Sequence, residues 1–225
     1  MGEMVTYDDG IPGYLAHSTR PRPGVVVIQE WWGLVDHVKD VCDRLGDAGF
    51  NALAPDFYRG ATTTEPDEAA KKMMEMDFPQ ALRDMSEAAD HLLADPNVTG
   101  DKVGVIGFCM GGALALALGA TRPDVIGAVV PFYGVHPWGD DTKPDYTTIG
   151  AAVLGHYAEH DTSFTPDMAR ALEAELGAAG IEATIHVHPG VDHAFFNDTR
   201  PEVYNEDVSA EVWLETLDFL DAHLR

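Results

Sequence analysis

The sequence predicts an α/β fold in which a doubly wound, mostly parallel sheet carries helices on both faces. Three observations predict this fold. Short apolar runs alternate with helical patterns of about ten or more residues, which is the order of a parallel sheet. The run at residues 103–108 passes through a glycine-flanked turn directly into an alanine–leucine helix. The 225 residues show no linker, repeat or low-complexity segment, so we expect a single domain over residues 1–225.

The individual elements follow from these patterns in chain order. Residues 5–7 and 14–17 flank turn-forming Asp, Gly and Pro and predict a short hairpin. Continuous apolar runs predict buried strands at residues 24–28, 51–55, 103–108, 126–130, 151–155 and 184–188. Helical spacing predicts helices at residues 36–48, 66–95 with a break near Pro79, around 113–118, 165–177 and 202–223. The loop at residues 133–150 either borders a ligand site at the sheet edge or is an ordinary solvated loop.

The charge balance excludes some partners. The chain carries 38 acidic and 14 basic residues, a net charge of −24. Nucleic acid is therefore not an expected partner, because phosphate contacts need a basic face. An acidic membrane surface would repel the protein, and no apolar stretch approaches the roughly 20 residues of a membrane span. The excess of acid either serves ordinary solubility or, as we expect, is an adaptation to a cytoplasm with molar salt.

Cysteine usage and the first residues of the chain indicate a cytoplasmic protein. Cys42 lies in a helical apolar pattern and is expected to be a core residue. With Cys109 as the other cysteine, there is no disulfide framework, which fits a reducing compartment. Residues 1–4 lack a basic region followed by an apolar one, so no secretory signal is expected. We expect a monomer or small homo-oligomer that needs no cofactor.

The segment Gly107-Phe108-Cys109-Met110-Gly111 carries the clearest chemical signal. Strand, sharp turn and helix meet at Cys109, which is the nucleophile elbow of α/β-hydrolases with cysteine in place of serine. Neighbours without a Cβ allow strand and helix to approach closely. The helix N-terminus favours a thiolate at the turn. The alternative is a structural cysteine buried under a helix.

An elbow of this kind needs an acid and a histidine later in the chain. Asp161 follows the strand at residues 151–155, and His193 follows the strand at residues 184–188. In this triad His193 would take the thiol proton and Asp161 would orient its imidazole. The acid could instead be Glu159 or Asp192, which are close in sequence. His160 competes with His193. His186 and His188 share one strand face, but without a third ligand of matching geometry we expect no metal site.

The chain resembles the dienelactone hydrolase family. The matching segments cover essentially the full length in the right order: Gln29-Glu30-Trp31-Trp32-Gly33, Pro55-Asp56-Phe57-Tyr58, the cysteine elbow, Tyr157-Ala158-Glu159-His160-Asp161 and His193-Ala194-Phe195. The resemblance implies an α/β-hydrolase fold and a triad of Cys109, Asp161 and His193.

The resemblance also implies that Glu30 holds the resting thiol and releases it when substrate binds. A carboxylate beside a thiol keeps it protonated by like-charge repulsion. Glu30 could instead be a loop acid that caps the following helix. The backbone N–H groups of Met110 and Trp31 match the expected oxyanion hole, one after the nucleophile and one from the early strand–helix loop.

The substrate is where the sequence departs from the resemblance. The family's lactone bears a carboxylate that cationic side chains bind. One arginine position, just beyond the triad histidine, is Asn197 here, and Arg200 lies three residues on. Lys71, with Lys72 beside it, matches the other cation. A neutral amide loses the bidentate contact to a carboxylate. Lys71, Phe195 and Asn197 are nevertheless the residues that we expect to bind substrate.

Several aromatic side chains either line an apolar pocket or pack in the core. They are Phe195, Phe196, Phe78, Trp31 and Trp32.

The elbow, the triad and the resemblance together predict a hydrolase that opens a lactone or cleaves an activated ester through a thioester. A general short-chain carboxylesterase or thioesterase is the first alternative. A non-hydrolytic ligand-binding or thiol-sensing protein on the same fold is the second.

Overall fold

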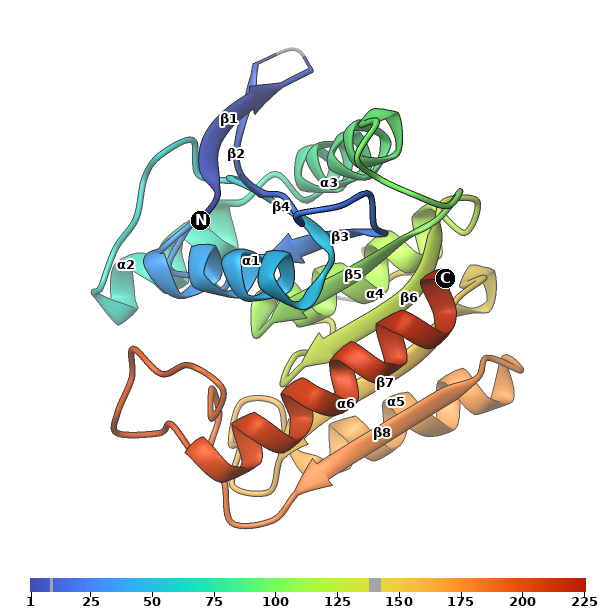
Figure 1. Ribbon diagram of the computed structural model, residues 1–225. Helices are drawn as coiled ribbons and strands as arrows, with labels where there is room; N and C mark the ends of the chain where they lie inside the picture. Colours follow the sequence, from blue (N-terminus) through green and yellow to red (C-terminus); the bar gives the residue numbers. More distant parts are fainter. Residues whose placement is uncertain (9, 138–142) are drawn as a thin grey trace.

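The strands form one sheet that is parallel at its centre and antiparallel at one edge. The computed structural model describes all residues except 9 and 138–142. In this part of the chain, eight strands lie in the order β1-β2-β4-β3-β5-β6-β7-β8 (Figure 1). Strands β1 and β2 are antiparallel to their neighbours, and the others pair in parallel. The expected α/β-hydrolase fold is confirmed.

The strands have the following bounds: β1 Glu3–Tyr7, β2 Ile11–Ala16, β3 Gly24–Ile28, β4 Asn51–Pro55, β5 Val103–Phe108, β6 Ile126–Phe132, β7 Ala152–Ala158 and β8 Ala183–His188. The helices are α1 Asp36–Ala48, α2 Pro66–Glu75, α3 Phe78–Ala94, α4 Met110–Thr121, α5 Pro166–Ala178 and α6 Glu206–Leu224, with a short 3₁₀ helix η2 at Tyr146–Thr148. Both sets agree closely with the ranges expected from the sequence.

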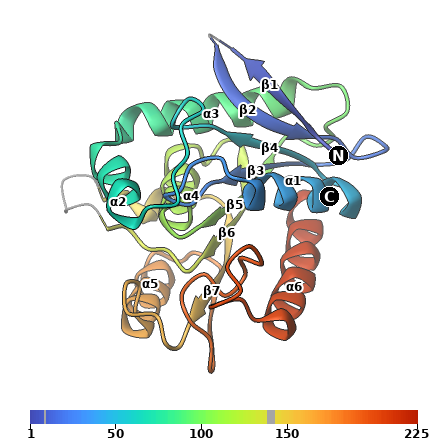
Figure 2. The same cartoon turned by 90° about the vertical axis from the view of Figure 1, so that its left-hand side faces the viewer.

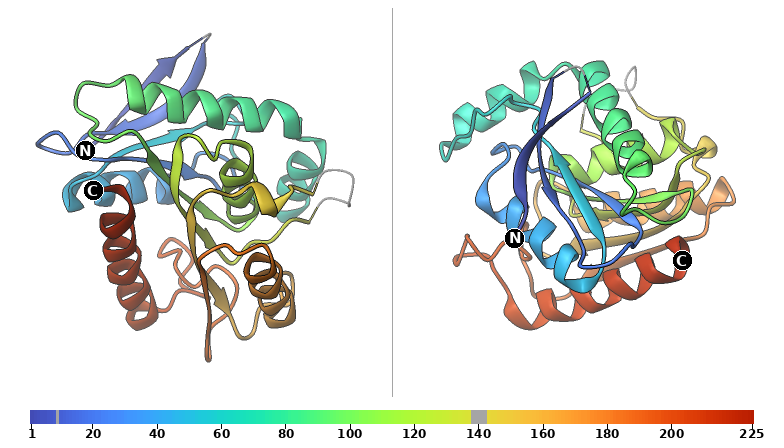
Figure 3. Two further views of the ribbon diagram at one scale, coloured as in Figure 1. Left: turned by 90° about the vertical axis from the view of Figure 1, so that its right-hand side faces the viewer. Right: turned by 45° about the horizontal axis from the view of Figure 1, so that its top comes forward.

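Helices cover both faces of the sheet, which explains why its central strands are apolar throughout. Helices α1 and α6 lie on one face, and α3, α4 and α5 lie on the other (Figures 2 and 3). All residues of β3, β4 and β5 are buried. Helix α4 is buried from Met110 to Ala120, so its Ala–Leu sequence packs on every side. The start of α4 is therefore held rigidly against the sheet.

Several boundaries differ from expectation, and two of the differences have a local reason in a helix cap. The helical region at residues 66–95 is broken at residues 76–77, where the Asp77 side chain caps α3 by accepting from the Gln80 N–H at 3.0 Å. The last helix begins at Glu206, because Asn205 caps it through the Val208 N–H at 3.0 Å. Strands β6 and β7 run two and three residues further than predicted.

The loop at residues 133–150 lies partly outside the described residues, at 138–142. Its described ends include the buried residues Tyr133 and Tyr146. Among the described residues, no helix combines the length and apolar composition that crossing a bilayer would require.

Candidate active site

Cys109 lies at the sharp turn between β5 and α4. Its φ of 55° is in the left-handed region, and its N–H donates to the Phe132 carbonyl oxygen at 3.0 Å. A Cβ on Gly107 would overlap the carbonyl oxygen of Gly111, and a Cβ on Gly111 would lie 2.5 Å from the carbonyl oxygen of Ile28. Only glycine fits at both positions, so this turn can hold the thiol in its strained conformation.

His193 and Asp161 meet beside the ends of the neighbouring strands. Asp161 follows β7, and its Oδ2 lies 2.6 Å from Nδ1 of His193. Its Oδ1 accepts from the N–H groups of Ser163 and Phe164, each at 2.8 Å. These bonds hold the carboxylate in place, and only 4% of Asp161 is exposed. The acid is therefore already oriented toward the imidazole.

His193 also reaches the nucleophile. Burial lowers its pKa, but hydrogen bonds to Asp161 and to Cys109 outweigh burial and raise the pKa to about 10. A protonated imidazole beside a thiol favours the thiolate, which is the nucleophilic form of cysteine. The structure thus brings Cys109, His193 and Asp161 together in hydrogen-bonding order.

Glu30 lies two residues beyond β3 and is 1% exposed. Its Oε2 accepts from the Asn197 side-chain amide at 2.9 Å. The Asn197 oxygen in turn accepts from the N–H and hydroxyl of Thr199, at 3.1 and 2.6 Å. Asn197 was predicted to bind substrate, but the structure places it, 2% exposed, as the partner of Glu30.

The two predicted oxyanion donors lie at the same edge of the sheet. Met110 is the first residue of α4, and Trp31 follows Glu30 in the loop after β3. Strands β3 and β5 are parallel neighbours, so these two segments leave the sheet side by side. That their N–H groups form an oxyanion hole stays a prediction.

Two other predicted substrate contacts are placed differently by the structure. Phe195 is fully buried, with its ring centroid 5.5 Å from that of Tyr133, so packing holds it beneath the site. The Lys71 side chain is 70% exposed and pairs with Glu75 at 3.9 Å. Lys72 lines a cavity instead, because it occupies the other side of α2.

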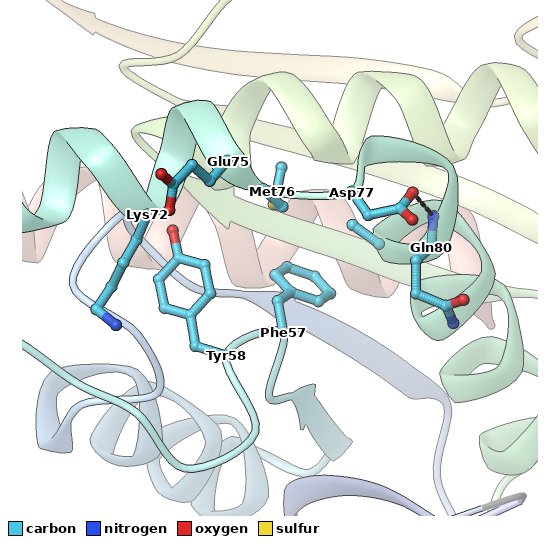
Figure 4. Close-up of a pocket in the computed structure, with 8 residues that line it drawn as sticks. Phe57, Tyr58, Lys72, Glu75, Met76, Asp77 and Gln80 are labelled. Atoms are coloured by element: carbon cyan, nitrogen blue, oxygen red, sulfur yellow. Dashed lines mark hydrogen bonds between the residues drawn. The ribbon is translucent and has the colours of Figure 1, made fainter.

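This cavity, of about 280 Å³, lies between the loop after β4 and the α2–α3 break (Figure 4). Phe57 and Tyr58 form one wall, opposite Lys72 and Met76. The Lys72 Nζ lies 5.7 Å from the Tyr58 ring centroid. The Tyr58 hydroxyl contacts the Met110 sulfur at 3.8 Å, so the cavity wall reaches the start of the elbow helix.

A second cavity, of about 380 Å³, is lined by residues from the loops after β3 and β8. Its lining includes Trp32, Asn197 and Arg200. The Arg200 Nε donates to Glu202 Oε1 at 2.9 Å, so its guanidinium already has an acidic partner. Any anionic substrate group in this cavity would compete with Glu202 for Arg200.

Two tyrosines at the site were not assigned a role from the sequence. Tyr58 belongs to a segment that matched the family, and Tyr133 directly follows β6. The Tyr133 ring centroid lies 5.0 Å from that of His193. Its position directly after a predicted strand could have identified Tyr133 from the sequence, because the residues just after parallel strands converge at one edge of the sheet.

The histidines on β8 form a different cluster. His188 Nε2 lies 3.1 Å from His156 Nδ1, and His186 Nε2 lies 2.8 Å from Glu215 Oε1. Burial, and then the two neighbouring histidines, lower the pKa of His156 well below its usual value. Among the residues that the structure describes, no group of three or more His, Cys, Asp or Glu side chains could hold a metal ion.

Comparison with known proteins gives a consistent result. The dienelactone hydrolase family matches the chain over residues 11–224. A protein named usf from Aquifex pyrophilus is 35% identical over 235 residues, and a putative carboxymethylenebutenolidase from Aquifex aeolicus is 33% identical over 235 residues; all of both chains is covered in each case.

Two solved structures are also similar. One is a putative dienelactone hydrolase from Klebsiella pneumoniae, with a TM-score of 0.86, 27% identity and 98% of each chain covered. The other is a dienelactone hydrolase-like promiscuous phosphotriesterase, P91, from metagenomic libraries. It has a TM-score of 0.88 and 27% identity, and 100% of this chain and 99% of that chain are covered.

Proposed function

Because this chain is a hydrolase that belongs to the dienelactone hydrolase family, we propose that it opens a lactone or cleaves an activated carboxylic ester with Cys109 as nucleophile. The observation that supports this most is the 2.6 Å contact between His193 and Asp161, with Cys109 close enough to help raise the pKa of His193. A purely structural cysteine would need neither partner.

The first half of the reaction forms a thioester. The Cys109 thiolate attacks the ester carbonyl carbon, and the tetrahedral oxyanion accepts hydrogen bonds from the N–H groups of Met110 and Trp31. The carbon–oxygen bond of the leaving alcohol then breaks, and His193 gives that oxygen a proton. In a lactone the leaving alcohol stays attached to the acyl group.

The second half returns the enzyme to its starting state. His193, now neutral, takes a proton from a water molecule, and the resulting hydroxide attacks the thioester carbon. The carbon–sulfur bond breaks, the carboxylic acid leaves, and Cys109 is again the thiolate beside a protonated His193 that can attack the next ester. When no substrate is bound, His193 returns this proton to Cys109. Asp161 stabilises the imidazolium whenever His193 carries the proton.

Glu30 is proposed to control the thiol before substrate binds. It is buried in the same site, and Asn197 holds one of its oxygens. A negative charge at Glu30 opposes the thiolate by like-charge repulsion. The protonated thiol would resist oxidation until the substrate changes the position or charge of Glu30.

Neutral activated esters suit this site better than carboxylate-bearing lactones. The position of the missing arginine is occupied by Asn197, which is committed to Glu30. The two cations nearest the cavities also have acidic partners, since Arg200 pairs with Glu202 and Lys72 lies 3.7 Å from Glu68. A substrate carboxylate would have to break one of these pairs.

The proposal is tested by measuring turnover of a dienelactone beside p-nitrophenyl acetate in molar KCl, with Cys109→Ala as the control. Cysteine-dependent ester cleavage without lactone opening is the expected result. Cysteine-dependent lactone opening would show that Lys72 or Arg200 replaces the missing arginine. A folded protein that turns over neither compound would contradict the proposed chemistry.

A further inference from the structure

Tyr133 lies directly beneath the catalytic groups. Its side chain is fully buried, and its ring stands edge-on to the imidazole of His193. Its N–H donates to the His156 carbonyl oxygen at 2.7 Å, and its φ of 36° is in the left-handed region. A non-glycine residue is uncommon in that region, so the surrounding structure holds this side chain in place.

The hydroxyl of Tyr133 has no hydrogen-bond partner among the described residues, although it is buried. Two other buried tyrosines, Tyr7 and Tyr157, do have partners. The Tyr7 hydroxyl donates to the Asp84 carbonyl oxygen at 3.2 Å, and the Tyr157 hydroxyl donates to the Gly134 carbonyl oxygen at 3.0 Å. An unpaired buried hydroxyl is destabilising, so its presence at a catalytic site calls for a functional explanation.

The groups around this hydroxyl are mostly negative. Burial first, and then the charges of Glu30, Cys109 and Asp161, raise the pKa of Tyr133 well above its usual value. Arg200 acts in the opposite direction. Three groups that can accept hydrogen bonds are therefore near enough to act electrostatically on this uncommitted O–H donor.

Most of these acceptors already have donors. Both Asp161 oxygens are occupied, Oδ2 by His193 and Oδ1 by two backbone N–H groups. Cys109 interacts with the imidazole of His193 and helps raise its pKa. Glu30 uses Oε2 for Asn197. In the described part of the chain, this leaves Oε1 as the carboxylate oxygen to which no protein group donates.

We propose that Tyr133 is a positioning residue for Glu30, an inference that rests on the proposed role of Glu30 in controlling the thiol. The Tyr133 hydroxyl donates to the second oxygen of Glu30, either after a rotation of the Glu30 side chain or through one water molecule. With Asn197 it then supplies two donors that keep the carboxylate ionised beside Cys109. Tyr133 thereby sets the pH at which the Cys109 thiol loses its proton.

The test measures iodoacetamide alkylation of Cys109 as a function of pH, followed by mass spectrometry so that buried Cys42 does not contribute. Tyr133→Phe is compared with the wild-type protein, and Glu30→Gln/Tyr133→Phe with Glu30→Gln. Loss of the donor favours neutral Glu30, which opposes the thiolate less. In the wild-type background, the acid limb of the plot of alkylation rate against pH should therefore move about one pH unit lower. In the Glu30→Gln background Tyr133→Phe should cause no further movement.

A thermal melt separates this role from a structural one. Tyr133→Phe should lower the Tm by no more than Tyr7→Phe does, because each substitution removes one hydrogen-bonding hydroxyl. The matched control is Tyr7→Phe, which removes a hydroxyl that is bonded and remote from the site. It should lower the Tm and leave the alkylation profile unchanged.

Two results would overturn the inference. Equal shifts in both backgrounds would mean that Tyr133 acts on Cys109 or His193 without Glu30, and no shift in the wild-type background would mean that the hydroxyl has no such role. Alkylation of Cys109 does not require ester turnover, so it tests the role of Tyr133 by itself. The comparison of the wild type with Cys109→Ala separately tests whether the protein hydrolyses esters.

Discussion

The side-chain amide of Asn197 donates a hydrogen bond of 2.9 Å to Oε2 of Glu30, joining two buried residues that are 167 positions apart in the chain. This contact connects the loop after β3 to the loop that carries His193. Asn197 therefore supports a buried carboxylate, and that it also binds substrate stays a prediction.

Asn197→Ala should destabilise the protein. Without the amide, Glu30 loses a buried charge-assisted hydrogen bond, and we expect the free energy of unfolding to fall by about 1–3 kcal/mol. Urea denaturation measures the change. Thr64→Ala is the control, because Thr64 lies at the same cavity with an exposed side chain. Equal stability of Asn197→Ala and the control would contradict this prediction.

Asp161→Asn should abolish most of the activity while leaving the fold intact. The amide oxygen can still accept from the two backbone N–H groups, but the imidazole loses its anionic partner and its correct tautomer. We expect kcat on p-nitrophenyl acetate to fall about 10³–10⁴-fold. Glu159→Gln is the matched control, since Glu159 is half-exposed and bonds to the Gly190 N–H. A large loss in the control and not in Asp161→Asn would move the acid to Glu159.

The protonation of His193 should contribute to stability in a defined pH range. Its pKa is about 10 in the folded protein, where burial is outweighed by its bonds to Asp161 and Cys109, and roughly 6.5 when unfolded. Because the folded value is raised, the contribution is complete below about pH 6.5 and is lost as the pH rises through 10. The unfolding free energy of the wild type should therefore fall over this range relative to His193→Gln. Parallel curves for the two proteins would exclude this linkage.

Glu30→Gln should make Cys109 easier to alkylate at low pH. The substitution removes a buried negative charge that opposes the thiolate, while Asn197 can still donate to the amide oxygen. The acid limb of the alkylation profile should move to lower pH. An unchanged profile would show that Glu30 does not control the thiol.

Salt should stabilise this protein. With a net charge of −24, the acidic side chains of the folded protein repel one another. Salt screens this repulsion, because the Debye length falls from about 10 Å at 0.1 M to about 3 Å at 1 M salt. The Tm should rise by several degrees between 0.1 M and 2 M KCl. The same Tm at both concentrations would refute an adaptation to molar salt.

The order of the fold could be predicted from local sequence, and the same sequence names a candidate triad. Buried parallel strands are continuous apolar runs, and helices have their own periodicity, so both kinds of element appear in the sequence near their true bounds. The elbow can also be identified locally, because Gly107, Cys109 and Gly111 lie within five residues and the two outer positions have no room for a Cβ. Chain order and strand ends then pointed to Asp161 and His193.

Contacts between distant segments were decided only by the tertiary structure. Lys71 and Lys72 are neighbours in sequence, but the helix turns about 100° per residue, so packing determines which one faces the cavity. Phe195 is buried against the ring of Tyr133, which follows a different strand. The sequence determined which residues could do the chemistry, whereas the packing of strand ends and loops determined that Asn197 holds Glu30 and that the Tyr133 hydroxyl lies unpaired beside the site.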